Sequence, residues 1–243
     1  MLEFQGKRAK LYNKLAWATE PSFIDAVVSA GKIRPTDTVL DVGIGTGIMT
    51  DAIAPLVHKV VGIDVSREML DLGTKHDNVK LVEGDIRESG LRSKSFDRIV
   101  ARQVFHHILS DMSRATKECY RLLKPGGLMI LAEGIPPTQE ATTFYKKTFA
   151  LKEERIVFSE RDLVSLLGRH NFLDVTLTCI WQRQSSVRNW LSNSNLAKGV
   201  QDKIFRMFLD DRILCEKAYN MTMHDDDCFI DMKQAIVVGR KGK

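Results

Sequence analysis

Residues 38–47 read Thr38-Val39-Leu40-Asp41-Val42-Gly43-Ile44-Gly45-Thr46-Gly47. The first five are mostly apolar or β-branched, which predicts a short buried strand. The three glycines at alternate positions then predict a tight turn whose backbone a ligand can approach closely. A helix is expected over residues 48–56. Because open α/β sheets bind ligands at the carboxyl ends of their strands, this turn is a candidate ligand site.

The glycine spacing favours a ligand other than a dinucleotide. The dinucleotide fingerprint is G-x-G-x-x-G, and here the third glycine comes one residue early. That fingerprint places a pyrophosphate at the positive N-terminus of a helix. Asp41, two residues before the first glycine, instead suits a ligand that carries positive charge nearby. An NAD-dependent enzyme is the competing interpretation of the cofactor, and a purely structural glycine turn is the simplest one.

Strands and helices alternate through the first half of the chain. Strands are predicted at residues 38–42, 59–63, 79–82, 96–101 and 128–132. Helices are predicted at residues 48–56, after the N-capping Ser66, and at about 111–123. This alternation is typical of βαβ units and a parallel sheet, so the predicted fold class is α/β.

The other residues are expected to complete a single domain over residues 1–243. Residues 1–37 predict an N-terminal helical cap, and residues 38–133 form the ligand-binding half. Further helices at 141–152 and from Ser159 precede two more strands, at 175–182 and 231–240. The segment between these last two strands, residues 185–228, predicts a helical insertion because apolar side chains recur at helical spacing. Its apolar stripes suit packing onto the domain, a lid or a dimer surface.

Two carboxylates follow the next strands along the chain. Asp64 ends the second predicted strand, where an acidic side chain can accept hydrogen bonds from both ribose hydroxyls. Asp85 follows the third strand and can accept from an adenine amino group; as a simple alternative it is a turn residue. Together they favour an adenosine-type ligand without a 2′-phosphate.

These motifs as a set resemble the class I S-adenosylmethionine-dependent methyltransferases, and among them the small-molecule type of ubiquinone and menaquinone biosynthesis. The resemblance covers about residues 35–135. It is carried by the glycine turn and by Gly62-Ile63-Asp64-Val65-Ser66 with Met69-Leu70, Gly84-Asp85, Phe96-Asp97 and Leu123-Lys124-Pro125-Gly126-Gly127. It implies a Rossmann-like doubly wound sheet of seven strands with an antiparallel last strand. It further implies S-adenosylmethionine as methyl donor and S-adenosylhomocysteine as product.

The resemblance also implies how the donor is bound. The glycine turn would cradle its methionine part, Asp64 its ribose, and Val65 and Met69 its adenine ring. Asp85 and Ile86 would meet the adenine amino group and ring, and Tyr12 matches an aromatic position that closes over the donor. The candidate donor-binding residues are Tyr12, Asp41, Gly43, Ile44, Gly45, Thr46, Gly47, Asp64, Val65, Met69, Asp85, Ile86, Arg102 and Gln103.

The candidate base lies in the loop that leaves the fourth strand. It contains His106 and His107, and because neighbouring side chains point in different directions, at most one is expected to face the acceptor. His106 is slightly favoured; either histidine would serve as a general base or as pocket wall. Arg102 and Gln103 begin this loop, where they could contact the methionine end of the donor.

The acceptor is predicted to be a small, apolar or aromatic organic molecule, methylated on carbon, oxygen or nitrogen. The segments expected to form its pocket are rich in large apolar side chains, which suits such a ligand better than a flat macromolecular surface. These side chains are Trp17, Phe105, Phe144, Tyr145, Phe149, Trp181 and Trp190.

Composition argues against several other classes of function. The net charge of +5 is dispersed, with only the tail Arg240-Lys241-Gly242-Lys243 locally basic, whereas nucleic-acid binding concentrates charge on one face. The cysteines form no CxxC pair, so reduced thiols in a cytoplasmic protein are expected. No metal site is predicted; the run His224 to Cys228 reads as a solvated turn. No apolar run approaches the roughly 20 residues of a membrane span.

Two other functions stay open. A nucleic-acid or protein methyltransferase is disfavoured because no Asn/Asp-Pro-Pro-aromatic motif follows the fourth strand, where residues 101–104 stand instead, and because no cysteine follows a proline. A non-catalytic scaffold that only binds the donor is disfavoured by the intact set of donor-binding residues. A homodimer is compatible with the sequence.

Overall fold

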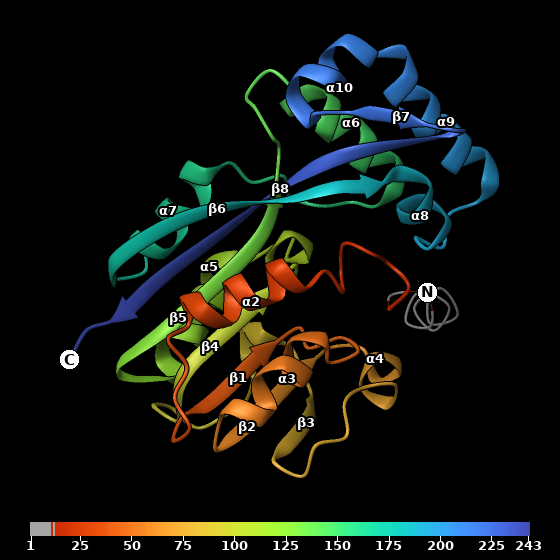
Figure 1. The fold of residues 1–243 in the computed structure, drawn as a ribbon. Helices are drawn as coiled ribbons and strands as arrows, with labels where there is room; N and C mark the ends of the chain where they lie inside the picture. Colours follow the sequence, from red (N-terminus) through yellow and green to blue (C-terminus); the bar gives the residue numbers. More distant parts are fainter. Residues whose placement is uncertain (1–10, 12) are drawn as a thin grey trace.

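The computed structural model describes residue 11 and residues 13–243 (Figure 1). One sheet runs through this part of the chain in the order β3-β2-β1-β4-β5-β8-β6, and the short β7 pairs with β8 as an eighth strand. The strands are β1 (Thr38–Val42), β2 (Lys59–Asp64), β3 (Val79–Glu83), β4 (Phe96–Arg102), β5 (Leu123–Ile135), β6 (Phe172–Ser186), β7 (Thr222–His224) and β8 (Asp227–Lys241).

Strands β1 to β5 pair in parallel, and β8 runs antiparallel to both β5 and β6. The predicted α/β class, parallel core and antiparallel last strand are therefore confirmed. The strand order reverses between β1 and β4, so their connections leave on opposite faces of the sheet. This point of reversal opens a crevice at the carboxyl ends of β1 and β4, where α/β sheets bind ligands.

Helices cover both faces of the sheet. They are α2 (Pro21–Ala30), α3 (Ile48–Ile53), α4 (Arg67–Asp71), α5 (Met112–Leu122), α6 (Thr142–Lys152), α7 (Glu160–Gly168), α8 (Val187–Ser192), α9 (Lys198–Asp210) and α10 (Arg212–Tyr219), with short 3₁₀ turns η1 (Ala54–Leu56), η2 (Ile86–Glu88) and η3 (Phe105–His107). Figure 1 shows α2 and α3 on one face, with α5 behind the sheet.

Alternate residues of the strands build two separate cores. Val39, Val100 and Ile130 pack with Phe23 and Met49 of α2 and α3. The residues next to them, such as Leu40, Ile99 and Met129, pack with α5 and α7 on the other face. Because successive side chains of a strand point to opposite faces, a central strand covered on both sides must be apolar throughout. This explains the near-continuous apolar runs in the sequence.

Strands β6 and β8 are the longest, at 15 residues each, followed by β5 at 13 residues. At a rise of about 3.3 Å per residue they extend roughly 50 Å, beyond the end of the parallel strands. Helices α6 and α8–α10 gather at this far end (Figure 1). They enclose a third core around Phe144, Trp190, Ile204, Phe208 and Tyr219, to which the N-terminal Leu15 and Ala18 also contribute.

The predicted bounds of the helical insertion, residues 185–228, are too wide at both ends. Ser185 and Ser186 still pair with β8, and residues 222–228 form the β7–β8 hairpin, so the helical part spans α8 to α10. Strand β6 lies at the edge of the sheet, where polar side chains face solvent, and its polar end reads as a loop in the sequence. A bulge at Gln184, which has a φ of +49°, lets the pairing continue. Strand β5 likewise begins at Leu123 and passes through a bulge that contains Gly126.

Candidate functional site

The glycine turn folds against the end of β2. The backbone N–H groups of Gly43 and Ile44 both donate to the carbonyl oxygen of Ile63, at 2.7 and 3.2 Å. Gly43, Gly45 and Gly47 have φ values of +64°, +55° and +89°. A Cβ atom on Gly43 would lie 2.1 Å from a methyl of Val104. Glycine is therefore required here both by conformation and by the close approach of the loop after β4.

Asp64 anchors this turn from the end of β2. Its Oδ2 accepts from Gly45 N and its Oδ1 from Ser66 N, both at 2.9 Å. Burial raises the pKa of Asp64, while these backbone N–H groups oppose the shift. Each carboxylate oxygen keeps further lone pairs, so Asp64 can hold the turn and still accept from a ligand hydroxyl.

Asp41 lies beneath the same turn and is 2% exposed. Its Oδ2 accepts from the hydroxyl of Thr50 at 2.7 Å. Burial raises the pKa of Asp41 to about 7, against the opposing effects of Thr50 and the nearby Arg102. A cation bound beside this carboxyl would favour its ionised form.

Asp85, at the end of β3, forms an ion pair with its neighbour Arg87. Arg87 Nη2 lies 2.6 Å from Asp85 Oδ2, and Arg87 Nε donates to both carboxylate oxygens. These hydrogen bonds lower the pKa of Asp85. The carboxylate is thus ionised and held in place at the mouth of the crevice.

A cavity of about 400 Å³ joins these groups, which we call the donor cavity. Of the candidate donor-binding residues, it is lined by Asp41, Gly43, Ile44, Gly45, Asp64, Val65, Met69, Asp85, Ile86, Arg102 and Gln103. Thr46 and Gly47 do not line it: Thr46 donates to the side chain of Asn13 at 2.6 Å, and Gly47 caps α3. Tyr12 lies outside the described residues.

Other residues, which were not predicted from the sequence, also line the donor cavity. They include Ile48, Met49, Ser66, Arg87, Val104 and Ile108. Arg87 had a detectable signal, since it stands two residues after the candidate adenine-binding carboxylate. The apolar residues had none, because an apolar side chain that faces a ligand looks in the sequence like one that faces the core.

A buried Glu133–His106 pair lies at the carboxyl ends of β5 and β4. Glu133 is fully buried; its Oε1 accepts from the backbone N–H groups of Val104, Phe105 and His106, and its Oε2 lies 2.6 Å from His106 Nδ1. Burial lowers the pKa of His106, although Glu133 opposes the shift. His106 is therefore neutral at pH 7. Because Nδ1 faces the Glu133 carboxylate, we assign the proton to Nδ1, so Nε2 can accept a proton.

A second cavity, of about 120 Å³, lies on the far side of His106, and we call it the acceptor cavity. Its apolar wall comes from α6, the insertion and the N-terminal segment: Leu15, Trp17, Phe144, Tyr145, Phe149, Trp190, Phe208 and Tyr219. Two of the predicted pocket residues are not part of it. Phe105 is fully buried in the main core, and Trp181 lies on β6 beside Arg183 and Lys233. The donor and acceptor cavities share Gln103 and His107.

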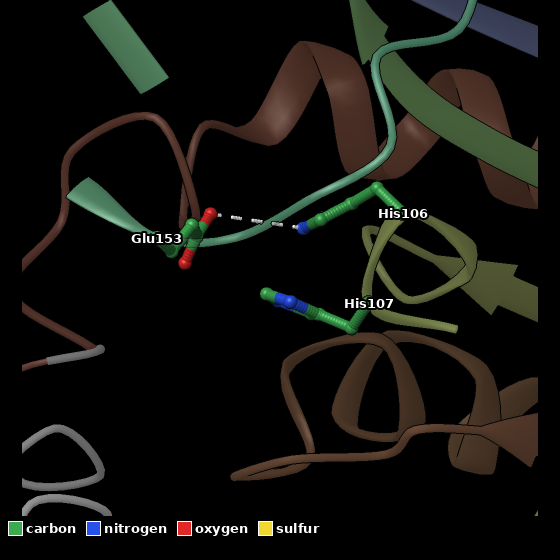
Figure 2. Close-up of side chains that lie close together, drawn as sticks. All are labelled: His106, His107 and Glu153. Atoms are coloured by element: carbon green, nitrogen blue, oxygen red, sulfur yellow. Dashed lines mark ion pairs between the residues drawn. The ribbon is translucent and has the colours of Figure 1, made fainter. Parts of the chain in front are cut away.

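Figure 2 shows that His106, His107 and Glu153 face one another at the edge of the acceptor cavity. Their ligand atoms lie within 4.8 Å of one another, close enough to hold a metal ion. Two cationic groups also surround Glu153, however: Lys152 Nζ at 2.9 Å and Arg155 Nη1 at 3.5 Å from its Oε1. These charges oppose a metal ion at this position.

The run from His224 to Cys228, considered in the sequence as a metal site, forms the β7–β8 turn. His224 pairs with Asp227, Asp225 has a φ of +52°, and Asp227 accepts from Arg188 N at 3.0 Å. The predicted turn is confirmed. None of the helices in the described part of the chain is long and apolar enough to cross a bilayer.

Comparison with known proteins agrees with this geometry. Residues 40–131 match the family model described as "Methyltransferase domain". This part of the chain is thus similar to a methyltransferase domain. The match begins within β1 and ends within β5, so the matched region contains the glycine turn, Asp64, Asp85 and both histidines.

Proteins similar to this chain include a demethylmenaquinone methyltransferase of Staphylococcus aureus, 32% identical over 152 residues, which are 60% of this chain and 61% of that one. The chain spans 54–61% of the length of the first curated relatives it matches.

Two solved structures share the fold. A Bacillus halodurans protein described as a candidate methyltransferase has a TM-score of 0.80 at 20% identity, covering 91% of this chain and 100% of that one. A Haemonchus contortus phosphoethanolamine N-methyltransferase 2, in complex with phosphomonomethylethanolamine and S-adenosylhomocysteine, has a TM-score of 0.66 at 15% identity. The match covers 91% of this chain and 53% of that one. The fold thus extends over residues that the family model does not match.

Proposed function

We propose that this protein is a cytoplasmic enzyme that transfers a methyl group from S-adenosylmethionine to a small, apolar or aromatic acceptor and releases S-adenosylhomocysteine. The observation that carries the proposal is the contact between two cavities of different chemistry. One is polar, acidic and built on the glycine turn; the other has aromatic walls; and they meet at Gln103 and His107.

The donor cavity suits S-adenosylmethionine group by group. Asp64 would accept hydrogen bonds from the ribose, and Asp85 from the adenine amino group, with Val65 and Met69 against the adenine ring. The turn at Gly43 to Gly45 would lie against the methionine part. Asp41 supplies a buried carboxyl near the cationic end of the donor, and the ligand offers no pyrophosphate that would need a helix N-terminus.

Methyl transfer from a sulfonium is an in-line displacement by a nucleophile on a donor that is already activated. The main task of the protein is to hold the two reactants in contact and to exclude water. Such positioning can supply about 7–11 kcal/mol of the barrier. The shared wall at Gln103 and His107 is where acceptor and methyl group would meet.

His106 is the proposed general base where the acceptor arrives protonated. Glu133 holds Nδ1, and Nε2 borders the acceptor cavity. A positioned base contributes about 10²- to 10⁴-fold. His107, exposed and bordering both cavities, is proposed as wall rather than base.

The insertion between β6 and β8 is proposed as the lid of the acceptor cavity. Trp190, Phe208 and Tyr219 come from this insertion and line the cavity together with α6. A cavity closed in this way accommodates a small molecule, and this supports a metabolite acceptor over a nucleic acid or a protein.

Calorimetric titration with S-adenosylhomocysteine tests the donor assignment. The wild-type protein is expected to bind it, and Asp64→Ala to lose binding by at least about tenfold, because the ribose and the glycine turn both lose an acceptor. Glu83→Ala is the control, since Glu83 ends the neighbouring strand β3 outside the cavity. Melting curves verify that each variant folds. Equal affinities in wild type and Asp64→Ala would contradict the site, and no binding to wild type would favour a scaffold without catalysis.

A further inference from the structure

We infer that the acceptor is a monocyclic hydroxy acid whose anionic group is bound by Arg155 and Lys152. The inference rests on the proposed function and specifies its acceptor. It is carried by the size of the acceptor cavity, by the charges along its wall and by a buried guanidinium with an unused hydrogen-bond donor.

The size of the acceptor cavity sets the size of the acceptor. Its volume is about 120 Å³. A dry cavity of about 150 Å³ lined by aliphatic and aromatic side chains accommodates one benzene ring. The aromatic rings of Phe144, Phe149 and Trp190 supply such a lining here. The acceptor body therefore has one ring rather than a fused polycyclic system.

The charged groups of the wall favour an anion. Of the described residues that line the acceptor cavity, three are Lys or Arg and one is acidic: Lys152, Arg155 and Lys233 against Glu153. Lys233 donates to Glu160 at 2.6 Å, outside the cavity. Glu153 forms ion pairs with both Lys152 and Arg155, and these three groups together carry a formal charge of +1. An anionic substituent on the ligand would be attracted to this end of the cavity.

Arg155 is built into the cavity wall. Its side chain is 6% exposed, and its guanidinium lies over the ring of Phe149 with the central carbon 4.4 Å from the ring centroid. The next residue, Ile156, donates its backbone N–H to the carbonyl of His106 at 2.9 Å, which fixes this loop beside the candidate base. Arg155 Nε is buried and has no hydrogen-bond partner in the described structure. A guanidinium presents its N–H groups as a planar fork that matches a carboxylate.

The hydroxyl of the acceptor would lie at the other side of Glu153. His106 Nε2 is 4.0 Å from the same carboxylate oxygen that Arg155 Nη1 approaches at 3.5 Å. One ring can therefore span the guanidinium and the imidazole. In the transfer step the acceptor O–H bond breaks and its proton goes to neutral His106 Nε2. The oxygen bonds to the methyl carbon as the carbon–sulfur bond breaks, and the sulfonium becomes a neutral thioether.

The inference is tested by calorimetry on protein saturated with S-adenosylhomocysteine. The probes are 3- and 4-hydroxybenzoate, their methyl esters, and 3-hydroxyphenyl phosphate. At least one of the two hydroxybenzoates is expected to bind about tenfold or more tightly than its methyl ester. The reason is that its carboxylate can form a charge-assisted hydrogen bond with Arg155, which the ester cannot. Tighter binding of the phosphate than of the acids would also support an anion site and identify a phosphate as the group it holds.

Variants assign the preference to Arg155. Arg155→Gln is expected to bind acid and ester equally, and Arg155→Lys to keep part of the preference, since it retains the charge without the fork. Arg161→Gln, an exposed arginine outside the cavity, is expected to keep all of it. Melting curves verify that each variant folds. If Arg155→Gln is unstable, the smaller preference for acid over ester in Arg155→Lys still tests the role of Arg155.

Different results would overturn different claims. Failure of S-adenosylhomocysteine to bind contradicts the proposed function. Donor binding with equal affinity for acid and ester in the wild type overturns the inference alone. The inference would also be overturned if the wild type bound zinc but none of the acids, and if His106→Asn abolished zinc binding. That result would assign His106, His107 and Glu153 (Figure 2) to a metal site.

Discussion

At the scale of single residues, Asp41 connects the stability of the fold with donor binding. Its carboxyl lies under the glycine turn, 2% exposed, and accepts a hydrogen bond from the hydroxyl of Thr50. With a pKa raised to about 7 by burial, it gains or loses its proton near neutral pH in the donor-free protein. A cationic donor favours the ionised form, so donor binding should release a proton.

We expect the affinity for S-adenosylmethionine to fall as the pH decreases through 7, because Asp41 then carries a proton. Asp41→Asn should bind the donor more weakly than wild type at pH 8 and show no such pH dependence. Titration calorimetry between pH 6 and 8 measures both effects. A wild-type affinity that is constant over this range would contradict the role of Asp41.

The same variant should be more stable without donor. The folded-state pKa of Asp41, about 7, lies above the unfolded value of 3.8, so the donor-free fold loses stability as the pH rises from 4 to 7. A shift of this size corresponds to about 4 kcal/mol. Asp41→Asn removes that penalty, and urea unfolding at pH 8 should give it the larger free energy of unfolding. This is the pattern of a carboxyl retained for binding at the expense of stability.

At the scale of secondary structure, η3 is held by a strand that is remote in the sequence. Glu133 at the end of β5 accepts three backbone N–H groups of residues 104–106 and also binds the imidazole of His106. The position of the candidate base thus depends on one carboxylate. An amide at this position could still accept from the backbone, but it would donate to Nδ1 and shift the proton of His106 to Nε2.

Glu133→Gln should therefore lower kcat by about 100-fold or more, as expected for loss of a general base. Donor affinity should be unchanged. In the wild type, kcat/KM should decrease only when the pH is lowered below 6.5, the ordinary pKa of histidine, because burial lowers the pKa of His106. In Glu133→Gln this decrease of kcat/KM at acid pH should be absent. Rate–pH profiles with an acceptor that supports turnover measure this, and Glu140→Gln, an exposed carboxylate on another loop, is the control. An unchanged profile in Glu133→Gln would argue that His106 is only part of the wall.

The strands and the glycine turn could be predicted because their causes are local. Gly43 must be glycine for its own φ, and apolar runs such as residues 38–42 are buried whatever lies next to them. The Glu133–His106 pair and the position of Arg155 depend instead on tertiary contacts between segments far apart in the sequence. The end of β6 was wrongly predicted because an edge strand tolerates the polar residues 183–186, which are also typical of a loop.

At the scale of the whole molecule, the donor and acceptor cavities are assembled from different parts of the chain. Among the described residues, those that line the donor cavity lie between Asp41 and Ile108, whereas those that line the acceptor cavity extend from Leu15 to Gln234. The donor cavity could be predicted from the motifs over residues 35–135. Five of the seven predicted pocket side chains line the acceptor cavity, but its size and charged wall could not be predicted, because they exist only where α6, the insertion and the N-terminal segment pack together.

This division predicts that the insertion can be damaged without loss of donor binding. Phe208 of α9 is 2% exposed and packs edge-on against Phe144, with 5.0 Å between ring centroids. Phe208→Ala should lower the free energy of unfolding by about 3–5 kcal/mol and weaken acceptor binding, because it removes a wall of the acceptor cavity. The affinity for S-adenosylhomocysteine should stay at the wild-type value. Ile213→Ala, on the neighbouring α10 but 85% exposed, is the matched control and should change stability by no more than about 0.5 kcal/mol. A parallel loss of donor affinity in Phe208→Ala would mean that the insertion also shapes the donor cavity, and the two cavities would then have to be treated as one cooperative unit.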